Sequence, residues 1–296
     1  MHLVTFIENN RSRIGVLDRS LQEVVDLAVV APSLPQDMLS LIAQGQAALE
    51  FVQQALDLGE GRLGLKDVRL LAPIPRPARN IFCVGKNYRE HVKEVQRAGS
   101  MLGKADTDEP EVPIIFTKAP SAVTGPGEAI PSHLDPTQST DYEGELAVVI
   151  GEGGRGIKRE DAMKHIYGYS IINDVTSRRL QRAHRQWFLG KSIDGFCPMG
   201  PALVTFDEIA DINELRIETR VNNEVRQNGS VSEMIFDIPC LIETLSRSMT
   251  LEPGDVIATG TPAGVGMGFN PPKWLQPGDR VAITIEPIGT LENPVI

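Results

Sequence analysis

The start of the chain contains short runs in which apolar and polar positions alternate. Residues 2–7 show this period of two, and Arg13–Leu17 and Glu23–Leu27 follow as further strand candidates. Beyond them, apolar residues recur at helical spacing, and Ser33 and Pro35 stand where a helix would begin. The pattern therefore predicts three strands followed by one helix. The apolar face of that helix consists of Met38, Leu41, Ile42, Leu49, Val52 and Leu56.

Strand patterns outnumber helical patterns in the rest of the chain. Asn222 and Asn223 follow one such run and predict a hairpin turn. Short apolar or alternating runs bounded by turn residues are typical of strands. The predicted strands are Val68–Leu71, Ile114–Thr117, Glu145–Ile150, Gly168–Ile172, Leu215–Val221, Val256–Thr259 and Val281–Glu286.

Only two helices are predicted in this part. One covers Ile238–Met249, and the other begins near Asp174, where Arg178, Gln181 and Arg185 recur at helical spacing. Because the strands are not separated by regular helices, the pattern argues against a doubly wound α/β sheet. We expect an α+β fold that is mostly β.

A proline-rich stretch divides the chain. Three prolines within residues 72–79 predict a stiff, extended connector. Residues 1–71 hold no cluster of residue types suited to catalysis, so we expect a small structural or assembly module there. The candidate chemistry falls within residues 80–296, which we expect to form a catalytic, metal-binding domain.

Composition excludes several classes of protein. Of 296 residues, 41% are hydrophobic and 23% are charged, which is ordinary for a globular protein with a substantial core. The net charge of -10, without any run rich in lysine and arginine, argues against a nucleic-acid partner. No stretch approaches the roughly 20 apolar residues that span a membrane. The first residues also lack the pattern of a signal peptide.

Cysteine usage fits a reducing compartment. Cys83, Cys197 and Cys240 are far apart, odd in number and without CxxC spacing. This arrangement argues against a disulfide framework or a zinc ribbon and favours three small buried side chains. We therefore expect a cytoplasmic protein.

A pair of glutamates begins one predicted strand. Glu143 and Glu145 are two residues apart, so they point to the same side of that strand. Two neighbouring carboxylates repel, and a divalent cation removes that repulsion. Ligand sets made only of oxygen favour Mg²⁺, Mn²⁺ or Ca²⁺ over zinc. An isolated pair of this kind is more often an exposed acidic face of a strand, so the metal site needs further support.

Asp174 provides part of that support. It ends the strand-like run from Gly168 and is well placed to reach a site at the edge of a sheet. The alternative is that Asp174 only caps the helix that follows. Spacing alone does not separate these two roles.

Two further patterns suggest catalytic groups. His91 and Glu94 share a face if residues 91–94 are helical, and a carboxylate beside an imidazole raises the basicity of a general base. The alternative is an ordinary solvated pair. Lys191 stands between Gly190 and Gly195 in a predicted loop. Near a metal, its ammonium group would stabilise an oxyanion or donate a proton, and otherwise it is simply exposed.

The glycine-rich stretch at residues 258–268 resembles a phosphate-binding loop at first sight. A dinucleotide-binding loop requires a helix immediately after it, and here two prolines follow at positions 271 and 272. The stretch also lacks the GK[ST] signature. We expect a loop that presents backbone N–H groups and Thr261 to a small anion, and no organic cofactor.

Taken together and in this order, these motifs resemble the fumarylacetoacetate hydrolase superfamily. The matching stretches are FCVGKNYREHVKE (82–94), DYEGELAVVIG (141–151), GYSIINDVTSRRLQ (168–181), GKSIDGFCPMGP (190–201) and ATGTPAGVG (258–266). The resemblance covers roughly residues 78–296. It looks closest to the shorter members, which include acylpyruvate hydrolases, oxaloacetate decarboxylases and hydroxymuconate-type isomerases.

The resemblance implies a fold and an assembly. The fold would be a mixed β-roll of the type of the family's C-terminal domain, usually assembled as a homodimer, with the small N-terminal α+β module that some members carry. Larger members use a fourth acidic metal ligand on the strand before the catalytic histidine. Residues 81–86 contain no acid. Three protein ligands are therefore expected, and fumarylacetoacetate itself is disfavoured as the substrate.

The resemblance also implies a role for each candidate residue. Glu143, Glu145 and Asp174 match ligands of Mg²⁺ or Mn²⁺, with Ca²⁺ as another occupant. His91 and Glu94 match a catalytic pair on a lid that orders over the substrate. The remaining matches are Lys191 as the active-site lysine, Arg178 and Gln181 as substrate contacts, and Thr261 in the anion-binding loop.

These roles lead to a functional hypothesis. Three carboxylates leave about three of the six positions of Mg²⁺ open, enough for a small-molecule 2-oxo acid to chelate through its carboxylate and 2-oxo group. We expect a hydrolase that cleaves a C–C bond in a 2,4-dioxo acid of the acylpyruvate or fumarylpyruvate type through a metal-bound enolate. Such reactions belong to aromatic catabolism. The same chelate serves an oxaloacetate decarboxylase or a 2-hydroxyhepta-2,4-diene-1,7-dioate isomerase. A metal-binding protein without turnover is the third alternative.

Overall fold

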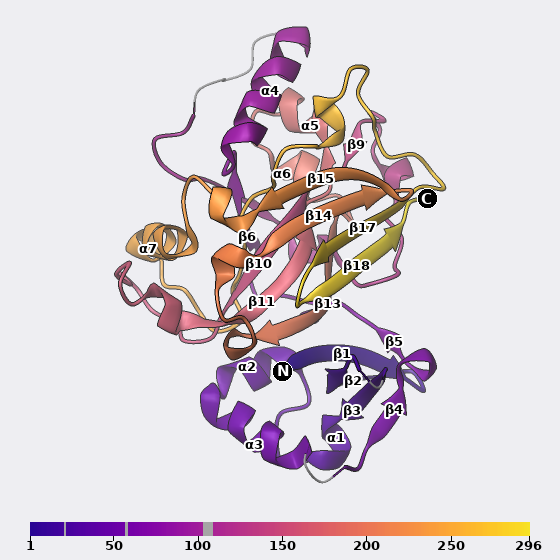
Figure 1. Cartoon of the computed structure of the whole chain (residues 1–296), viewed down its shortest axis with the longest axis vertical. Helices are drawn as coiled ribbons and strands as arrows, with labels where there is room; N and C mark the ends of the chain where they lie inside the picture. The colour runs from indigo at the N-terminus through magenta and orange to yellow at the C-terminus, as the bar shows by residue number, and fades with distance from the viewer. Residues whose placement is uncertain (21, 57–58, 103–108) are drawn as a thin grey trace.

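One mixed sheet runs from the N-terminal module into the rest of the protein (Figure 1). The computed structural model describes residues 1–20, 22–56, 59–102 and 109–296. The main path of this sheet follows the order β4-β3-β2-β1-β13-β11-β10-β16-β6-β7. The module joins the remainder where β1 pairs with β13, through His2 opposite Val204 and Leu3 opposite Leu203. Backbone hydrogen bonding therefore links the two parts of the chain in addition to residues 72–79.

The N-terminal module contains the three strands that alternation predicts. They are β1 (His2–Glu8), β2 (Arg11–Asp18) and β3 (Glu23–Asp26), and two short strands follow, β4 (Arg62–Gly64) and β5 (Arg69–Leu70). Apolar residues of the sheet and of the module's helices pack together in one buried cluster, so this part is held by apolar packing.

The single helix predicted in the module is wrong, because two helices occur after a short first one. The helices of the module are α1 (Leu27–Val30), α2 (Met38–Ala43) and α3 (Gln46–Leu56). Gly45 separates α2 from α3 with a φ of 65°, a conformation that favours glycine and ends a helix. The residue that caps α2 is Asp37, whose side chain accepts a hydrogen bond from the Ser40 N–H, and not Ser33.

The rest of the large sheet carries the candidate chemistry. β10 pairs antiparallel with β11, and the only parallel pairing along the main path within the described residues joins β16 to β6. The mostly β, α+β class is thereby confirmed. The strands of this part are β6 (Ile81–Gly85), β7 (Ile114–Lys118), β8 (Val123–Thr124), β10 (Gly144–Ile150), β11 (Ile166–Asn173), β13 (Cys197–Thr205) and β16 (Val256–Ala258).

A second, four-stranded sheet packs against β10, β11 and β13 (Figure 1). Asn222 and Asn223 form the predicted hairpin turn between two of its strands, with φ values of 50° and 68°. Apolar residues of both sheets, such as Leu146, Ile171 and Ile283, share one buried core. The strands of the second sheet are β14 (Arg216–Val221), β15 (Glu224–Ser230), β17 (Arg280–Ile285) and β18 (Gly289–Pro294).

Two short strands and a helix replace the helix that was predicted to begin near Asp174. Residues Thr176–Ser177 form β12, which pairs with β9 (Thr140–Asp141), and α5 (Arg178–Ala183) begins only after that pairing. Arg185 lies beyond the end of α5 with a φ of 59°. Asp174 is therefore not the cap of this helix, because that position belongs to Ser177.

Three further α-helices occur in the described residues of this part. They are α4 (Arg89–Leu102), α6 (Phe188–Lys191) and the predicted α7, which covers Ile238–Ser248 and is capped by Asp237. No helix in the described part of the chain has the length and apolar character needed to cross a membrane. All three cysteines are free thiols; Cys83 and Cys197 are buried and Cys240 is half-buried.

Candidate metal centre and active site

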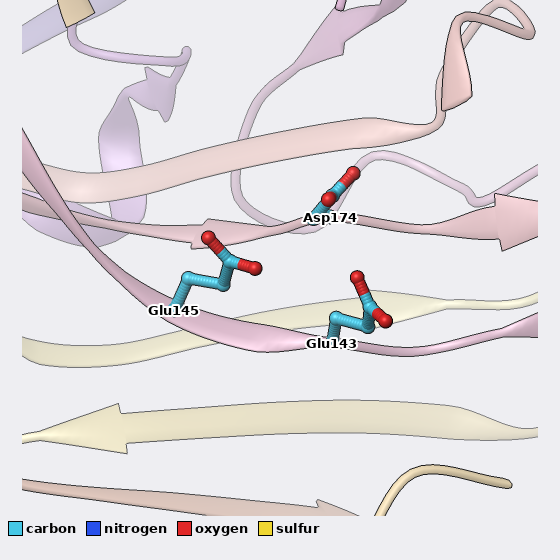
Figure 2. Close-up of side chains that lie close together, drawn as sticks. All are labelled: Glu143, Glu145 and Asp174. Carbon is cyan, nitrogen blue, oxygen red and sulfur yellow. The ribbon is translucent and has the colours of Figure 1, made fainter. Parts of the chain in front are cut away.

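Three buried carboxylates meet where β10 and β11 lie side by side. Glu143 directly precedes β10, Glu145 is its second residue, and Asp174 directly follows β11. Figure 2 shows the two glutamates on one segment pointing toward Asp174 on the other. The three residues offer oxygen atoms that all lie within 4.8 Å of one another. Within the described residues, these three carboxylates form a group that is compact enough to hold one metal ion.

The pairing of the two strands explains why residues 31 positions apart in the chain meet. Gly144 lies opposite Asn173 in the antiparallel ladder, so the residues just outside it are neighbours. The Asp174 N–H donates to the Glu143 carbonyl at 2.8 Å, and the Glu143 N–H donates to Oδ1 of Asn173 at 3.0 Å. The predicted ligand set is thus held together by backbone geometry.

Three buried cations surround these carboxylates. Nζ of Lys191 lies 2.5 Å from Oε2 of Glu143 and 2.6 Å from Oδ2 of Asp174. Nη2 of Arg178 lies 2.6 Å from Oε1 of Glu143. Nζ of Lys118 donates to Oδ1 of Asp174 at 2.7 Å and to the Val175 carbonyl at 3.0 Å. Lys191 ends the short helix α6 and is buried, so it does not lie in an exposed loop.

Lys118 was missed by the sequence analysis. It is the last residue of β7 and is fully buried. The available signal was a lysine placed directly at the end of an apolar strand, where a buried charge requires a partner.

The charges of Glu143 and Glu145 are compensated to different degrees. Burial alone would raise the pKa of Glu143, but Arg178 and Lys191 outweigh it and hold that pKa well below its usual range. Burial, followed by the charges of Asp174 and Glu143, raises the pKa of Glu145 well above its usual range. Glu145 accepts a hydrogen bond from the Gly260 N–H at 2.9 Å, and no ion pair with it occurs in the described part of the chain.

The uncompensated charge of Glu145 shows whether these residues suit a metal ion. A buried carboxylate without a cation is costly to ionise, and a hard divalent cation next to Glu145 would remove that cost. The donor set consists only of carboxylate oxygens, as Mg²⁺, Mn²⁺ and Ca²⁺ prefer. The residues present therefore fit a divalent cation held by Glu143, Glu145 and Asp174.

Lys191 remains charged despite its burial. Desolvation acts to lower its pKa, but the carboxylates of Asp174 and Glu143 outweigh this effect and raise the pKa to about 12. A permanently protonated ammonium group beside the cluster can donate hydrogen bonds to an anion, but it is a poor proton acceptor.

His91 and Glu94 form a buried pair on the first turns of α4. Nδ1 of His91 lies 3.0 Å from Oε2 of Glu94, as the helical spacing predicts. Both side chains are buried, which excludes the alternative of a solvated surface pair. His91 is close enough to the cluster to contribute to the lowered pKa of Glu143. The structure thus places a candidate base beside the candidate metal centre.

The glycine-rich segment presents backbone N–H groups to three of the protein's own carboxylates, and its contact with a small anion stays a prediction. The Gly260 N–H donates to Glu145, and the Gly264 N–H donates to Oε1 of Glu94 at 2.9 Å. The N–H groups of Gly266 and Met267 donate to the two oxygens of Asp141 at 2.7 and 3.1 Å. The segment therefore orders the carboxylates of the site.

Thr261 is tied into the same framework. Its hydroxyl donates to the Gly144 carbonyl at 2.9 Å and accepts from Nε2 of Gln227 at 2.7 Å. Oε1 of Gln227 in turn accepts from the Gly144 N–H at 3.0 Å. Gln227, which the sequence analysis did not single out, thus joins this loop to the residue between the two glutamates. The contact of Thr261 with a substrate stays a prediction.

Arg178 and Gln181 lie on one face of α5. Nε of Arg178 donates to Oδ2 of Asp141 at 2.8 Å, and Nη1 lies 3.5 Å from Oε1 of Gln181. Arg178 is buried and Gln181 is half-buried. Arg178 lies against Glu143 and Gln181 lies against Arg178, and Asp141 is the carboxylate that holds the arginine. The contact of either residue with a substrate stays a prediction.

Comparison with known proteins agrees with this geometry. The family model described as "Fumarylacetoacetate (FAA) hydrolase C-terminal" matches residues 80–296. The chain is 51% identical to the oxaloacetate tautomerase YisK of Bacillus subtilis over 271 residues, which cover 89% of this chain and 87% of that protein.

Two solved structures are similar over the whole chain. A fumarylacetoacetate hydrolase from psychrophilic Exiguobacterium antarcticum is 45% identical, with a TM-score of 0.82 over 100% of this chain and 99% of that one. Maleylpyruvate hydrolase from Sphingobium sp. SYK-6, solved with manganese(II) and pyruvate, is 30% identical, with a TM-score of 0.79 over 100% and 99%.

Proposed function

This chain belongs to the fumarylacetoacetate hydrolase family, a family of enzymes, and we propose that it interconverts the enol and keto forms of oxaloacetate with the help of a divalent cation. The observation that carries the proposal is the buried His91–Glu94 pair beside a three-carboxylate cluster. The identity of 51% to an oxaloacetate tautomerase supports the choice of substrate.

Glu143, Glu145 and Asp174 would hold the cation. When bound, a Mg²⁺ or Mn²⁺ ion would supply a Lewis acid that polarises the 2-oxo group of a 2-oxo acid. The chain itself contributes the orientation of the ligands, because β10, β11 and the Gly260 N–H fix their positions.

His91 would move the proton at carbon. A carboxylate partner favours the tautomer in which Nδ1 carries the proton and donates to Glu94, so that Nε2 accepts a proton from C3 of the keto form. The imidazolium then delivers this proton to the enolate oxygen. In the reverse direction Nε2 takes the hydroxyl proton of the enol and delivers it to C3, so the imidazole is neutral again after each conversion. Glu94 stabilises the imidazolium that exists between the two steps.

The cations of the site would bind the anionic substrate. Lys191 stays protonated and donates hydrogen bonds toward the oxygen on which charge develops. Arg178, held by Asp141 and Glu143, offers a fixed guanidinium group for a carboxylate. Burial of these groups excludes water from the oxygen atoms concerned, which strengthens each charged contact.

A second candidate is hydrolytic cleavage of a C–C bond in an acylpyruvate. It is favoured by the similarity to maleylpyruvate hydrolase and by the same His91–Glu94 pair, which would activate a water molecule. The two reactions differ in whether the base removes a proton from carbon or from water. The residues that hold the cation serve both.

A substrate panel separates these functions. The purified protein is offered enol-oxaloacetate, acetylpyruvate, fumarylpyruvate and maleylpyruvate with Mg²⁺, with Mn²⁺ or with EDTA. Enol loss is followed by ultraviolet absorbance, and pyruvate formation is measured separately to detect decarboxylation or hydrolysis. We expect metal-dependent acceleration of enol loss without matching pyruvate release.

Two variants complete the test. His91→Ala should lose the acceleration by at least about 100-fold, in line with the usual contribution of a general base. Lys93→Ala, on the exposed face of the same helix, should behave like the unmodified protein. Pyruvate release that equals enol loss would show that the protein is a decarboxylase and not a tautomerase. Turnover of an acylpyruvate alone would establish the second candidate.

A further inference from the structure

Asp141 lies at the point where three parts of the candidate site meet. It ends the short strand β9, two residues before Glu143, and its side chain is fully buried. Its oxygens accept hydrogen bonds from Gly266 and Met267 on one side and from Nε of Arg178 on the other. Asp141 is not part of the cluster that could hold a metal, so its burial requires another explanation.

The turn held by Asp141 is also the turn that holds Glu94. The segment 264–268 begins with the Gly264 N–H, which donates to Oε1 of Glu94 at 2.9 Å. It ends in η8 (Gly266–Gly268), which contacts helix α4. Oε2 of the same carboxylate is bonded to His91. The two oxygens of Glu94 thus join the turn to the imidazole.

Steric constraints at two positions of this turn explain why they are glycines. A Cβ on Gly266 would lie 2.6 Å from Oδ1 of Asp141, and a Cβ on Gly268 would lie 2.0 Å from Oε1 of Glu94. Both distances are too short for real contacts. The backbone therefore approaches both carboxylates as closely as glycine allows, and the space for each carboxylate is built into the turn.

We propose that Asp141 is a positioning residue that acts on the His91–Glu94 pair through the turn 264–268. Asp141 fixes the N–H groups of Gly266 and Met267, the turn fixes the Gly264 N–H, and that N–H sets the orientation of Glu94 and hence of His91. Arg178 anchors Asp141 from the opposite side. The catalytic part of this inference rests on the proposed function, but the structural coupling does not.

Amide hydrogen exchange tests the coupling without any substrate. Asp141→Asn retains the size of the side chain but loses the charge and one acceptor oxygen. We expect the amides of residues 89–97 in α4 to exchange about tenfold faster, because a hydrogen bond to a charged group is lost at the turn that seats them. Asp135→Asn is the matched control: Asp135 is also buried and accepts bonds from Thr137, Ser139 and Ser177 in the neighbouring loop. It should leave exchange in α4 unchanged.

A second variant separates the turn from general loss of structure. Gly268→Ala places a methyl group against the Glu94 carboxylate and leaves Asp141 in place. It should itself accelerate exchange in α4, and adding Asp141→Asn should then have no further effect on those amides. Unchanged exchange in folded Asp141→Asn, or equal acceleration in Asp135→Asn, would overturn the proposal.

Kinetics test the catalytic consequence. Asp141→Asn should lower kcat about tenfold, and in a Glu94→Gln background the same change should lower kcat by no more than about twofold, because the path through Glu94 is already broken. If loss of the Asp141 charge also displaces Arg178 and raises KM, that rise should occur both in the parent protein and in Glu94→Gln. Independent, multiplying effects on kcat would show that Asp141 does not act through Glu94 and would overturn the proposed path. If no 2-oxo acid is turned over, the proposed function fails while the exchange experiment still decides the coupling.

Discussion

The N-terminal module and the candidate active site share one sheet but are stabilised in opposite ways. In the described part of residues 1–71, Asp26 is the only buried charged side chain, and it pairs with Arg13. Around β10 and β11, the buried charged or titratable residues include four carboxylates, two lysines and one arginine. Apolar burial stabilises a fold directly, whereas buried charges are weak sources of stability. The difference indicates that the charged cluster is retained for chemistry.

Removing apolar volume from the module should give the largest change in stability. Leu41 is fully buried in α2 within the apolar cluster. Leu41→Ala should lower the free energy of unfolding by about 2–5 kcal/mol through lost burial and the cavity that remains. Urea denaturation measures this value. The affinity for Mn²⁺, measured by calorimetry on the folded variant, should not change, and a large loss of affinity would contradict the separation of the two regions.

Removing a charge from the site should lower the metal affinity and leave the stability unchanged or higher. Glu145→Gln retains the shape of the side chain and breaks no ion pair of the described residues. We expect the affinity for Mn²⁺ or Mg²⁺ to fall at least about 100-fold, because one of three anionic ligands is lost. The metal-free variant should be at least as stable as the parent protein. An unchanged metal affinity would remove the central claim about this cluster.

In the candidate site, Glu145 and Glu143 should make stability depend on pH in opposite directions. The pKa of Glu145 is raised in the folded state, so the metal-free folded protein binds more protons than the unfolded chain. Its stabilising contribution is present below the ordinary glutamate pKa and is lost as pH rises through the raised value. Glu143 has a lowered pKa, and its contribution is lost only as pH falls below the ordinary value.

Urea denaturation in the presence of EDTA, between pH 5 and pH 8, tests the direction in which stability changes with pH. Stability of the metal-free protein should decline with rising pH by about 1.4 kcal/mol for each pH unit over which folded Glu145 keeps its proton while the same residue in the unfolded chain has lost it. Saturating Mn²⁺ should reverse the trend, because the cation binds the ionised form. Glu145→Gln should flatten the profile, and a decline that persists in this variant would assign the effect to another group.

The smallest expected effect concerns the break between the two module helices. Gly45 has a φ of 65° and open space around its Cα, so a methyl group there meets no atom and only the backbone is strained. Gly45→Ala should lower stability by about 1–2 kcal/mol, the energy of a left-handed conformation for an alanine. Thermal denaturation measures the change, and metal affinity should be unaffected. A stabilised variant would mean that the two helices join into one.

The sequence predicted the strands and the carboxylates that lie together better than the interactions among the other side chains. Period-two spacing and the acid after β11 suggested Glu143, Glu145 and Asp174 without deciding their role, and the antiparallel ladder does bring the three carboxylates together. That they bind a metal stays a prediction. The pairing of His91 with Glu94 followed from helical spacing. Each of these inferences depends on residues that are close in sequence or on one pair of adjacent strands.

The residues that were missed depend on distant parts of the chain. Lys118 and Asp174 are 56 positions apart, and Gln227 and Gly144 are 83 positions apart. No local pattern states that these side chains meet. The glycine-rich segment was predicted to present N–H groups to a small anion, which stays a prediction. Only the tertiary structure shows that its N–H groups donate to the carboxylates of Glu94, Asp141 and Glu145.

The pairing of β1 with β13 has a consequence for attempts to shorten the protein. A chain that begins at residue 80 would leave the backbone groups of Leu203 and Val204 without their strand partner. An uncovered strand edge is a template for pairing with other chains and a common origin of aggregation. Strand β1 thus prevents this edge of β13 from pairing with other chains. A truncated protein would need a charged or proline substitution near Leu203 to remain monodisperse.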